Sequence, residues 1–481
     1  MSDAAPVSPA LTRGIVTRYA IGSIGTGGFG TLPGLVLTYY LTDNLGVTAL
    51  LAGVIVTAAK VWDVVIDPVV GALSDADVAR HGTRRRLMLV GAIALPVLFA
   101  LTFAVPPDLA PAVGAIWVLL AFMATATAFS LFQVPYIALP AELTEGYDAR
   151  TRLLTWRVVV LTFAILLFGA GGPILRGLTG DPTTGYLLMG VVSGVVIGAG
   201  MLVATTVAGR AARVRSAMAA AGTSAAEAAE LVADSVGERH PHRVGRDAST
   251  PGGGARDNFR AAGETLRRSQ PFRALLLTFV LQAIATGLML AGAQYLATWV
   301  LQSEDAVTML FVALIAPALL AAPAWGVLAR RVGKEWAFAL ASALFAVAAV
   351  STLAALWSPG AWIYVSVGVA GVAYAGMQSL PMAMLPDVIS HDAQRHGPGR
   401  AGAFGGVWTA GETAGFALGA TVLTVVLTIT GYIERTAGQQ VTQPGEAIAG
   451  IVISFSVIPA ALVTLSLLTL LRYRLRRDDI E

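Results

Sequence analysis

The sequence contains no cysteine and little charge. Without thiols, disulfides and thiolate metal sites are excluded, and the five histidines show no metal-ligand spacing. Charged residues make up only 13% of the 481 residues, against 56% apolar residues, and the mean hydropathy is +0.72. Soluble domains carry about 25% charged residues. The composition therefore indicates an integral membrane protein.

The residue sets of an enzyme are also missing from the sequence. It shows no nucleophile beside a base, no phosphate-binding loop and no metal motif, so we expect neither catalysis nor a bound cofactor. The first thirteen residues lack the apolar core of a signal peptide, so the first hydrophobic segment should remain as an anchor. The net charge of +3 lies mostly in loops, where it indicates membrane topology rather than nucleic-acid binding.

Long apolar runs predict an all-α membrane protein with twelve transmembrane helices, since each crossing needs about 20 apolar residues. The predicted helices lie near residues 15–41, 46–72, 87–106, 112–138, 153–176, 184–208, 273–300, 306–328, 336–357, 361–385, 403–430 and 447–471. Arg-bearing segments such as 74–86 and 209–270 alternate with Arg-free ones such as 106–111 and 302–307. Since cytoplasmic loops carry the excess of Arg and Lys, we expect both termini in the cytoplasm and the chain in the cell (inner) membrane.

Two short patterns recur six helices apart and divide the chain into halves. Pro68-Val-Val-Gly-Ala-Leu is repeated as Pro323-Ala-Trp-Gly-Val-Leu, and Pro135-Tyr-Ile-Ala-Leu-Pro as Pro381-Met-Ala-Met-Leu-Pro. Such repeats are typical of transporters built from two pseudo-symmetric six-helix halves. The expected parts are a cytoplasmic tail (1–14), an N-terminal half (15–208), a partly disordered cytoplasmic linker (209–270), a C-terminal half (271–471) and a second tail (472–481).

The predicted second helix carries three ionisable residues at membrane depth. Lys60, Asp63 and Asp67 are three and four residues apart, so they share one helix face. A charge at this depth costs at least about 2.5–3.5 kcal/mol and usually faces a wet cavity or an ion path. The alternative is that Lys60 and Asp63 neutralise each other to hold two helices together. Three charges cannot all be neutralised in one ion pair, however. In the second half of the chain, Ala322 stands at the position that corresponds to Asp67.

The two carboxylates can converge on one small cation or share a proton. Na⁺ would bind Asp63, Asp67 and further oxygens, and a hydroxyl is available at Ser130 on the fourth helix. Arg157 on the fifth helix could balance the second carboxylate, or its side chain could instead extend to the membrane surface. The sequence thus predicts H⁺ or Na⁺ as a coupling ion, with Lys60 and Arg157 balancing charge.

Further polar and aromatic residues are candidates for a gate and for a substrate cavity. Asp75 with Arg84 and Arg85 forms a possible cytoplasmic latch, although an ordinary basic loop has the same composition. For each cavity candidate, core or interfacial packing is the default interpretation, except for Glu412, an acid inside a helix with no local partner. The candidate substrate-binding residues are Gln133, Tyr136, Trp156, Tyr374, Gln378, Trp408 and Glu412.

The segment KVWDVVIDPVVG at 60–71, followed by Asp75, Gly82 and Arg84-Arg85, resembles the signature of the glycoside-pentoside-hexuronide:cation symporters. These include the melibiose-permease group of the major facilitator superfamily. The resemblance extends to Tyr39-Tyr-Leu-Thr-Asp43, Gln133-Val-Pro-Tyr136, Arg157 and Leu385-Pro-Asp387. It implies a twelve-helix alternating-access transporter, a cation site at Asp63, Asp67 and Ser130, and a cytoplasmic gate that includes Asp387.

The sugar-binding part of the resemblance is weaker. An Asn usual beside the second aspartate is Ile66 here, which favours proton coupling, and the two sugar-binding aspartates of the permease fall at Gly27 and Gln133. The expected lysine of helix eleven is absent where Glu412 and Thr413 stand.

We therefore expect a monomeric secondary transporter in the lipid bilayer that couples a small polar solute, sugar or glycoside-like, to a Na⁺ or H⁺ gradient. The alternatives are a proton-coupled exporter of a hydrophobic metabolite or drug, a lipid transporter, and a non-transporting membrane sensor that uses the 209–270 linker.

Overall fold

The computed structural model describes residues 12–143, 147–236, 266–396, 401–473 and 475. The expectations for most of the two tails and for the middle of the linker, residues 237–265, lie outside these residues. Within them, twelve helices or helix pairs are long and apolar enough to cross a membrane, which confirms the predicted all-α fold.

The N-terminal half contains six membrane-crossing helices, the first of them divided at Gly22. They are α1 (Arg13–Ile21) with α2 (Ser23–Asp43), α3 (Ala49–His81), α4 (Arg85–Thr102), α5 (Pro111–Leu143), α6 (Tyr147–Gly177) and α7 (Pro182–Val236).

The C-terminal half contains six more crossings, of which three are composed of two segments. They are α9 (Gln270–Tyr295) with the π-helical η1 (Leu296–Val300), α10 (Ala306–Val332), α11 (Lys334–Ser351) with the 3₁₀ segment η2 (Thr352–Leu356), α12 (Trp362–His396), α13 (Ala401–Ile429), and α14 (Gly445–Phe455) with α15 (Val457–Leu470).

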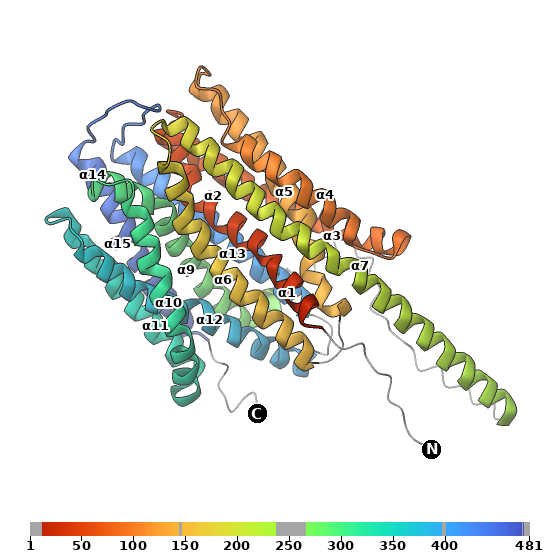
Figure 1. Ribbon diagram of the computed structural model, residues 1–481. Coiled ribbons are helices and arrows are strands. Elements are labelled where there is room, and N and C mark those ends of the chain that lie inside the picture. The colour runs from red at the N-terminus through yellow and green to blue at the C-terminus, as the bar shows by residue number, and fades with distance from the viewer. Residues whose placement is uncertain (1–11, 144–146, 237–265, 397–400, 474, 476–481) are drawn as a thin grey trace.

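Three helices, α3, α7 and α12, continue well beyond the ends that hydropathy predicts, and α12 runs to His396. α3 runs through the polar residues 74–81 and stops where Gly82 adopts a left-handed φ of +68°, a conformation that glycine takes without steric cost. α7 runs to Val236, through part of the predicted linker, where the sequence is rich in Ala. Hydropathy marks where the membrane ends, whereas helix propensity and capping decide where the helix ends. Figure 1 shows the extension of α7 projecting from the same end of the bundle as the start of α1.

The glycines of α2 allow the helices to approach closely. A Cβ atom added at Gly27 would lie 2.7 Å from the Cβ of Ala164 on α6, and one at Gly28 would lie 2.7 Å from Ile197 on α7. Neither position can take a larger side chain without moving a neighbouring helix. These glycines therefore pack α2 into the N-terminal half.

The two halves repeat the same packing. The pairs α2–α6, α3–α5 and α4–α5 in the first half correspond to α9–α13, α10–α12 and α11–α12 in the second. Between the halves, α3 packs on α13, α2 on α9 and α6 on α10. The carboxylates of α3 therefore lie on a helix that borders the boundary between the halves.

Candidate cation and substrate site

Two carboxylates of α3 each have one near partner. The Nζ atom of Lys60 lies 3.2 Å from Oδ2 of Asp63, and Ser130 on α5 donates a hydrogen bond of 2.6 Å to Oδ1 of Asp67. The second Asp63 oxygen, Oδ1, is buried and has no hydrogen-bond partner among the described residues. The structure thus brings Lys60, Asp63, Asp67 and Ser130 together, with one carboxylate oxygen free to accept a proton or a cation.

The opposite face of α3 is apolar and exposed. Val61, Val65 and Val69 are 48–56% exposed, and they lie about 200° around the helix from Asp63 and Asp67. An exposed valine stripe suits contact with lipid. The carboxylates therefore point away from the face that meets the acyl chains, and both are only partly buried.

Aromatic and hydroxyl groups surround this charged face. The Lys60 ammonium lies 5.7 Å from the centroid of the Phe29 ring on α2, within the range of a cation–π contact. Trp62 donates a 2.9 Å hydrogen bond to Thr127 on α5, which fixes α3 against α5 next to Asp67.

Arg157 and Tyr136 meet near the same face of the N-terminal half. The Arg157 guanidinium lies 5.7 Å from the centroid of the Tyr136 ring. The Tyr136 hydroxyl donates to the backbone oxygen of Tyr19 at 2.7 Å and lies 3.0 Å from Ser23 Oγ, and its side chain is fully buried. In this conformation the Tyr136 hydroxyl is therefore engaged by other groups of the protein. Arg157 keeps a buried Nε without a partner among the described residues.

The other two substrate candidates of the N-terminal half differ in exposure. The amide oxygen of Gln133 accepts a 2.8 Å hydrogen bond from Thr26 of α2. Trp156 on α6 is 52% exposed. In this conformation Gln133 is tied to α2, and Trp156 presents a free aromatic surface.

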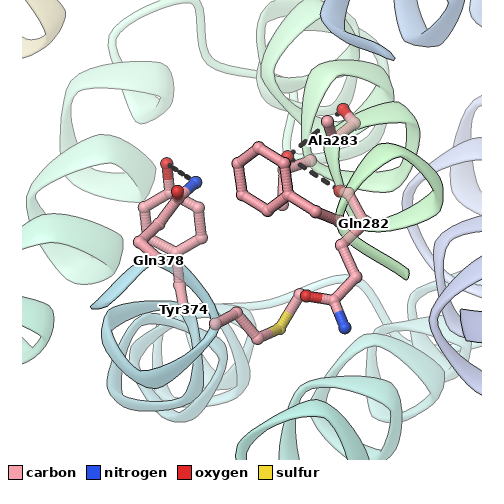
Figure 2. Close-up of a pocket in the computed structure, with 7 residues that line it drawn as sticks. Gln282, Ala283, Tyr374 and Gln378 are labelled. Atoms are coloured by element: carbon pink, nitrogen blue, oxygen red, sulfur yellow. Dashed lines mark hydrogen bonds between the residues drawn. The ribbon is translucent and has the colours of Figure 1, made fainter. Parts of the chain in front are cut away.

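The candidates of the C-terminal half lie on α12 and α13. Gln378 donates a 2.9 Å hydrogen bond to the hydroxyl of Tyr374, and both residues border a small cavity against α9 (Figure 2). Trp408 is buried and stacks on Phe279 of α9 with ring centroids 4.3 Å apart. Glu412 is partly buried and follows Trp408 by one helical turn.

The residues proposed for a cytoplasmic gate pair within their own halves. Arg84 forms an ion pair of 2.9 Å with Asp75 and donates to Ser74 at 2.6 Å, and Arg85 is exposed. Asp387 on α12 is paired with Lys334 at the start of α11. The ion pairs lie at the end of the bundle where α1 begins and α15 ends.

A polar cluster at the opposite end joins the two halves. We call Asp43, Arg176, Glu304, Tyr432 and Arg435 the distal cluster, because it lies at the far end from the termini. Asp43 is 1% exposed and accepts hydrogen bonds from Tyr432 at 2.8 Å and from Arg435 Nε at 3.1 Å. Glu304 lies 3.4 Å from both Arg176 and Arg435. These contacts close the halves against each other at the distal end.

The distal cluster keeps its donors protonated. Burial and the neighbouring Asp43 carboxylate raise the pKa of the Tyr432 hydroxyl, so this group remains a donor. Burial alone would lower the pKa of Arg435, but Tyr39 and Asp43 raise it above its usual value. The cluster is therefore held by charge-assisted bonds, which are stronger than neutral ones.

The sequence contained only weak signals of this cluster. Asp43 appeared only as the end of the Tyr39–Asp43 motif, and its partners lie about 390 residues further along the chain. Arg176 and Arg435 both lie on the side of the membrane where Arg is scarce, and these positions were the available clues.

We predict that Arg435→Gln opens the distal end. The substitution removes the bonds to Asp43, Tyr39 and Glu304, and it leaves a buried carboxylate without its cation. A single reporter, Leu290→Cys, lies at the contact of α9 with Gly34 on α2. Its labelling by a membrane-impermeant maleimide should become about tenfold faster, which corresponds to about 1.4 kcal/mol.

Arg331→Gln is the matched control, because Arg331 lies in the last turn of α10 at the opposite end of the bundle. An equal labelling rate in both variants would mean that the distal cluster does not hold the halves together.

Comparison with solved structures shows which class of protein has this architecture. The chain superposes on the crystal structure of a D-xylose-proton symporter with a TM-score of 0.67 at 13% identity, covering 97% of this chain and 98% of that one. At this identity the likeness concerns the fold alone. Twelve crossings in two repeated halves are the arrangement of the major facilitator fold.

The chain belongs to the MFS/sugar transport protein family, whose model matches residues 18–244 and 236–477. It is a multi-pass membrane protein of this family, as the sequence predicted. Among its relatives, the uncharacterized symporter YnaJ of Bacillus subtilis (strain 168) is 23% identical over 447 residues, 91% of this chain and 87% of YnaJ.

Other curated relatives match over shorter stretches. The uncharacterized symporter sll1374 of Synechocystis sp. is 36% identical over 144 residues, 29% of this chain and 25% of that protein. The glucuronide carrier protein homolog of Escherichia coli (strain K12) is 29% identical over 161 residues, 33% of this chain and 35% of that protein. The chain thus spans about a quarter to a third of the length of these two relatives.

Proposed function

We propose that this protein is a symporter that couples the uptake of a sugar or glycoside-like solute to a cation gradient. The observation that carries the proposal is the group on α3 and α5, where Asp67 is bonded to Ser130 and Asp63 to Lys60 on the face turned away from lipid. Support also comes from the family match and from relatives that are named symporters.

We propose a proton as the coupling ion. Asp63 is already engaged by the Lys60 ammonium, and Ile66 supplies no ligand oxygen between the two acids. Na⁺ needs several oxygens, whereas a proton needs one carboxylate and a path to it. Within the residues that the structure describes, no group of three or more acidic or histidine side chains forms a metal site.

In the alternating-access cycle, the distal end is the closed end in this conformation. We place the protein in the inner membrane with both termini in the cytoplasm, so that the distal cluster faces outward and this state faces inward. Release of the proton and of the solute to the cytoplasm, and reopening of the distal end, would then complete the cycle.

Uptake into proteoliposomes tests the function. The full chain is reconstituted and offered radiolabelled methyl glycosides under an imposed H⁺ gradient, an imposed Na⁺ gradient, or neither. We expect accumulation above the equilibrium level with the H⁺ gradient, and its loss when a protonophore is added. Accumulation that follows Na⁺ alone would overturn the choice of ion, and downhill equilibration under all conditions would overturn the coupling.

A further inference from the structure

A small cavity in the C-terminal half lies between α9 and α12 (Figure 2). Its cavity volume is about 10 Å³. A space of this size holds one water-sized group, so in this conformation it suits a single hydroxyl or ammonium group of a ligand. The cavity is lined by Phe279, Gln282, Ala283, Thr286, Tyr374, Met377 and Gln378.

The amide of Gln282 is oriented by its neighbours. Its nitrogen donates to the hydroxyls of Ser342 and Ser466 at 2.9 and 3.0 Å. Both hydroxyls donate their own hydrogens to backbone oxygens of their helices, so they can only accept a hydrogen bond from Gln282. The amide oxygen is therefore the free end of a side chain that is 2% exposed, and it has no partner among the described residues.

A second buried polar atom without a partner belongs to Trp408 on α13. The indole Nε1 of Trp408 is a donor that bonds to none of the described residues, although the side chain is 3% exposed. The ring stacks on Phe279, which lines the cavity. Buried polar groups in folded proteins nearly always have a partner. A free acceptor on one cavity-lining residue, and a free donor on a ring that stacks on another, thus indicate a bound polar ligand.

Glu412 adds a negative charge to this group. It lies one turn after Trp408 on α13, and its carboxylate is near enough to the Tyr374 hydroxyl for the two to interact electrostatically. No ion pair joins Glu412 to any cation in the described part of the chain. Lys334 is held by Asp387 near the membrane surface, and Lys60 by Asp63 in the other half.

We propose that Gln282, Trp408 and Glu412 form a subsite for the hydroxylated part of an uncharged or amine-bearing sugar, and that Glu412 rejects sugars that carry a carboxylate. The proposal rests on the proposed sugar transport and adds the class of sugar. Gln282 and Glu412 accept hydrogen bonds from hydroxyl or ammonium groups, and Trp408 donates one. A uronate at this position would meet the Glu412 carboxylate without an intervening cation, and like charges brought together in a binding site oppose binding.

Three matched probes test the subsite: methyl glucoside, its uronate analogue and glucosamine. Binding to the full-length protein in detergent is measured by isothermal titration calorimetry without any ion gradient, and uptake is measured separately in proteoliposomes. We expect the wild type to bind the neutral and amino sugars at least about tenfold more tightly than the uronate. Glu412→Gln should narrow this ratio to about threefold or less, while Glu446→Gln, an exposed acid at the start of α14, leaves it unchanged.

A second variant examines the free acceptor. Gln282→Leu keeps a side chain of similar size and removes the amide oxygen, so binding of the neutral sugar should weaken about tenfold. Any of three results would overturn the subsite. The wild type could prefer the uronate, the affinity ratio between neutral sugar and uronate could stay unchanged in Glu412→Gln, or no probe could bind. Coupled uptake with no such discrimination would leave the transport function standing and reject the subsite. The predicted binding pattern without coupled uptake would leave the subsite standing and reject the transport function.

Discussion

Asp67→Asn is expected to abolish accumulation of solute under an ion gradient while leaving downhill exchange in place. Asparagine keeps the shape of the side chain and can still accept the hydrogen bond from Ser130, but it can neither take up a proton nor supply a negative charge to a cation. The loss should be complete within the sensitivity of the assay, because coupling needs a group whose charge changes during the cycle. Two quantities are measured in proteoliposomes of the same preparation: accumulation of solute under an ion gradient, and downhill exchange by counterflow.

Asp77→Asn is the control for this substitution. Asp77 lies on the same helix beyond the membrane-depth charges and bonds to His81 at 2.8 Å. We expect this variant to accumulate solute like the wild type. If Asp67→Asn accumulates solute equally well, the ion is coupled elsewhere, and Glu412 becomes the next acid to replace.

The helices and the first charged face could be predicted from the sequence, for a simple physical reason. Crossing a bilayer requires about 20 apolar residues in a row, and such runs are visible without any knowledge of packing. The spacing of Lys60, Asp63 and Asp67 also fixes a common face by helix geometry alone. The bond from Ser130 to Asp67 is different, because the sequence offered Ser130 only as an available hydroxyl on another helix and no local pattern joins α3 to α5.

The distal cluster could not be predicted, because it depends on how the two halves meet. Asp43 and Arg435 end up 3.1 Å apart only after α2 packs on α9 and the loop before α14 folds over that contact. Tyr136 shows the same limit. It is a residue of the type that lines a cavity, but its hydroxyl donates a hydrogen bond to the backbone oxygen of Tyr19. Residue type and depth indicate which side chains can serve a site, whereas packing decides which of them are free.

A reversible covalent lock between α3 and α13 is expected to stop transport. The hydroxyls of Thr57 and Thr421 are hydrogen-bonded across the boundary between the halves, so two sulfur atoms in their places need only a small approach to form a disulfide. The natural sequence has no cysteine, so Thr57→Cys with Thr421→Cys can form no competing bridge within the chain. Oxidation should reduce uptake to background, and a reducing agent should restore it.

The single variant Thr57→Cys, oxidised in the same way, should transport like the wild type and so controls for damage by the oxidant. Formation of the bridge is verified by mass spectrometry of the proteolysed protein, which makes the transport result interpretable in either direction. In alternating access, the distal ends of the halves must separate once in each cycle, and a bond across α3 and α13 forbids that separation. Full uptake by a chain with a verified bridge would show that this contact stays closed throughout the cycle, and that solute enters by another route.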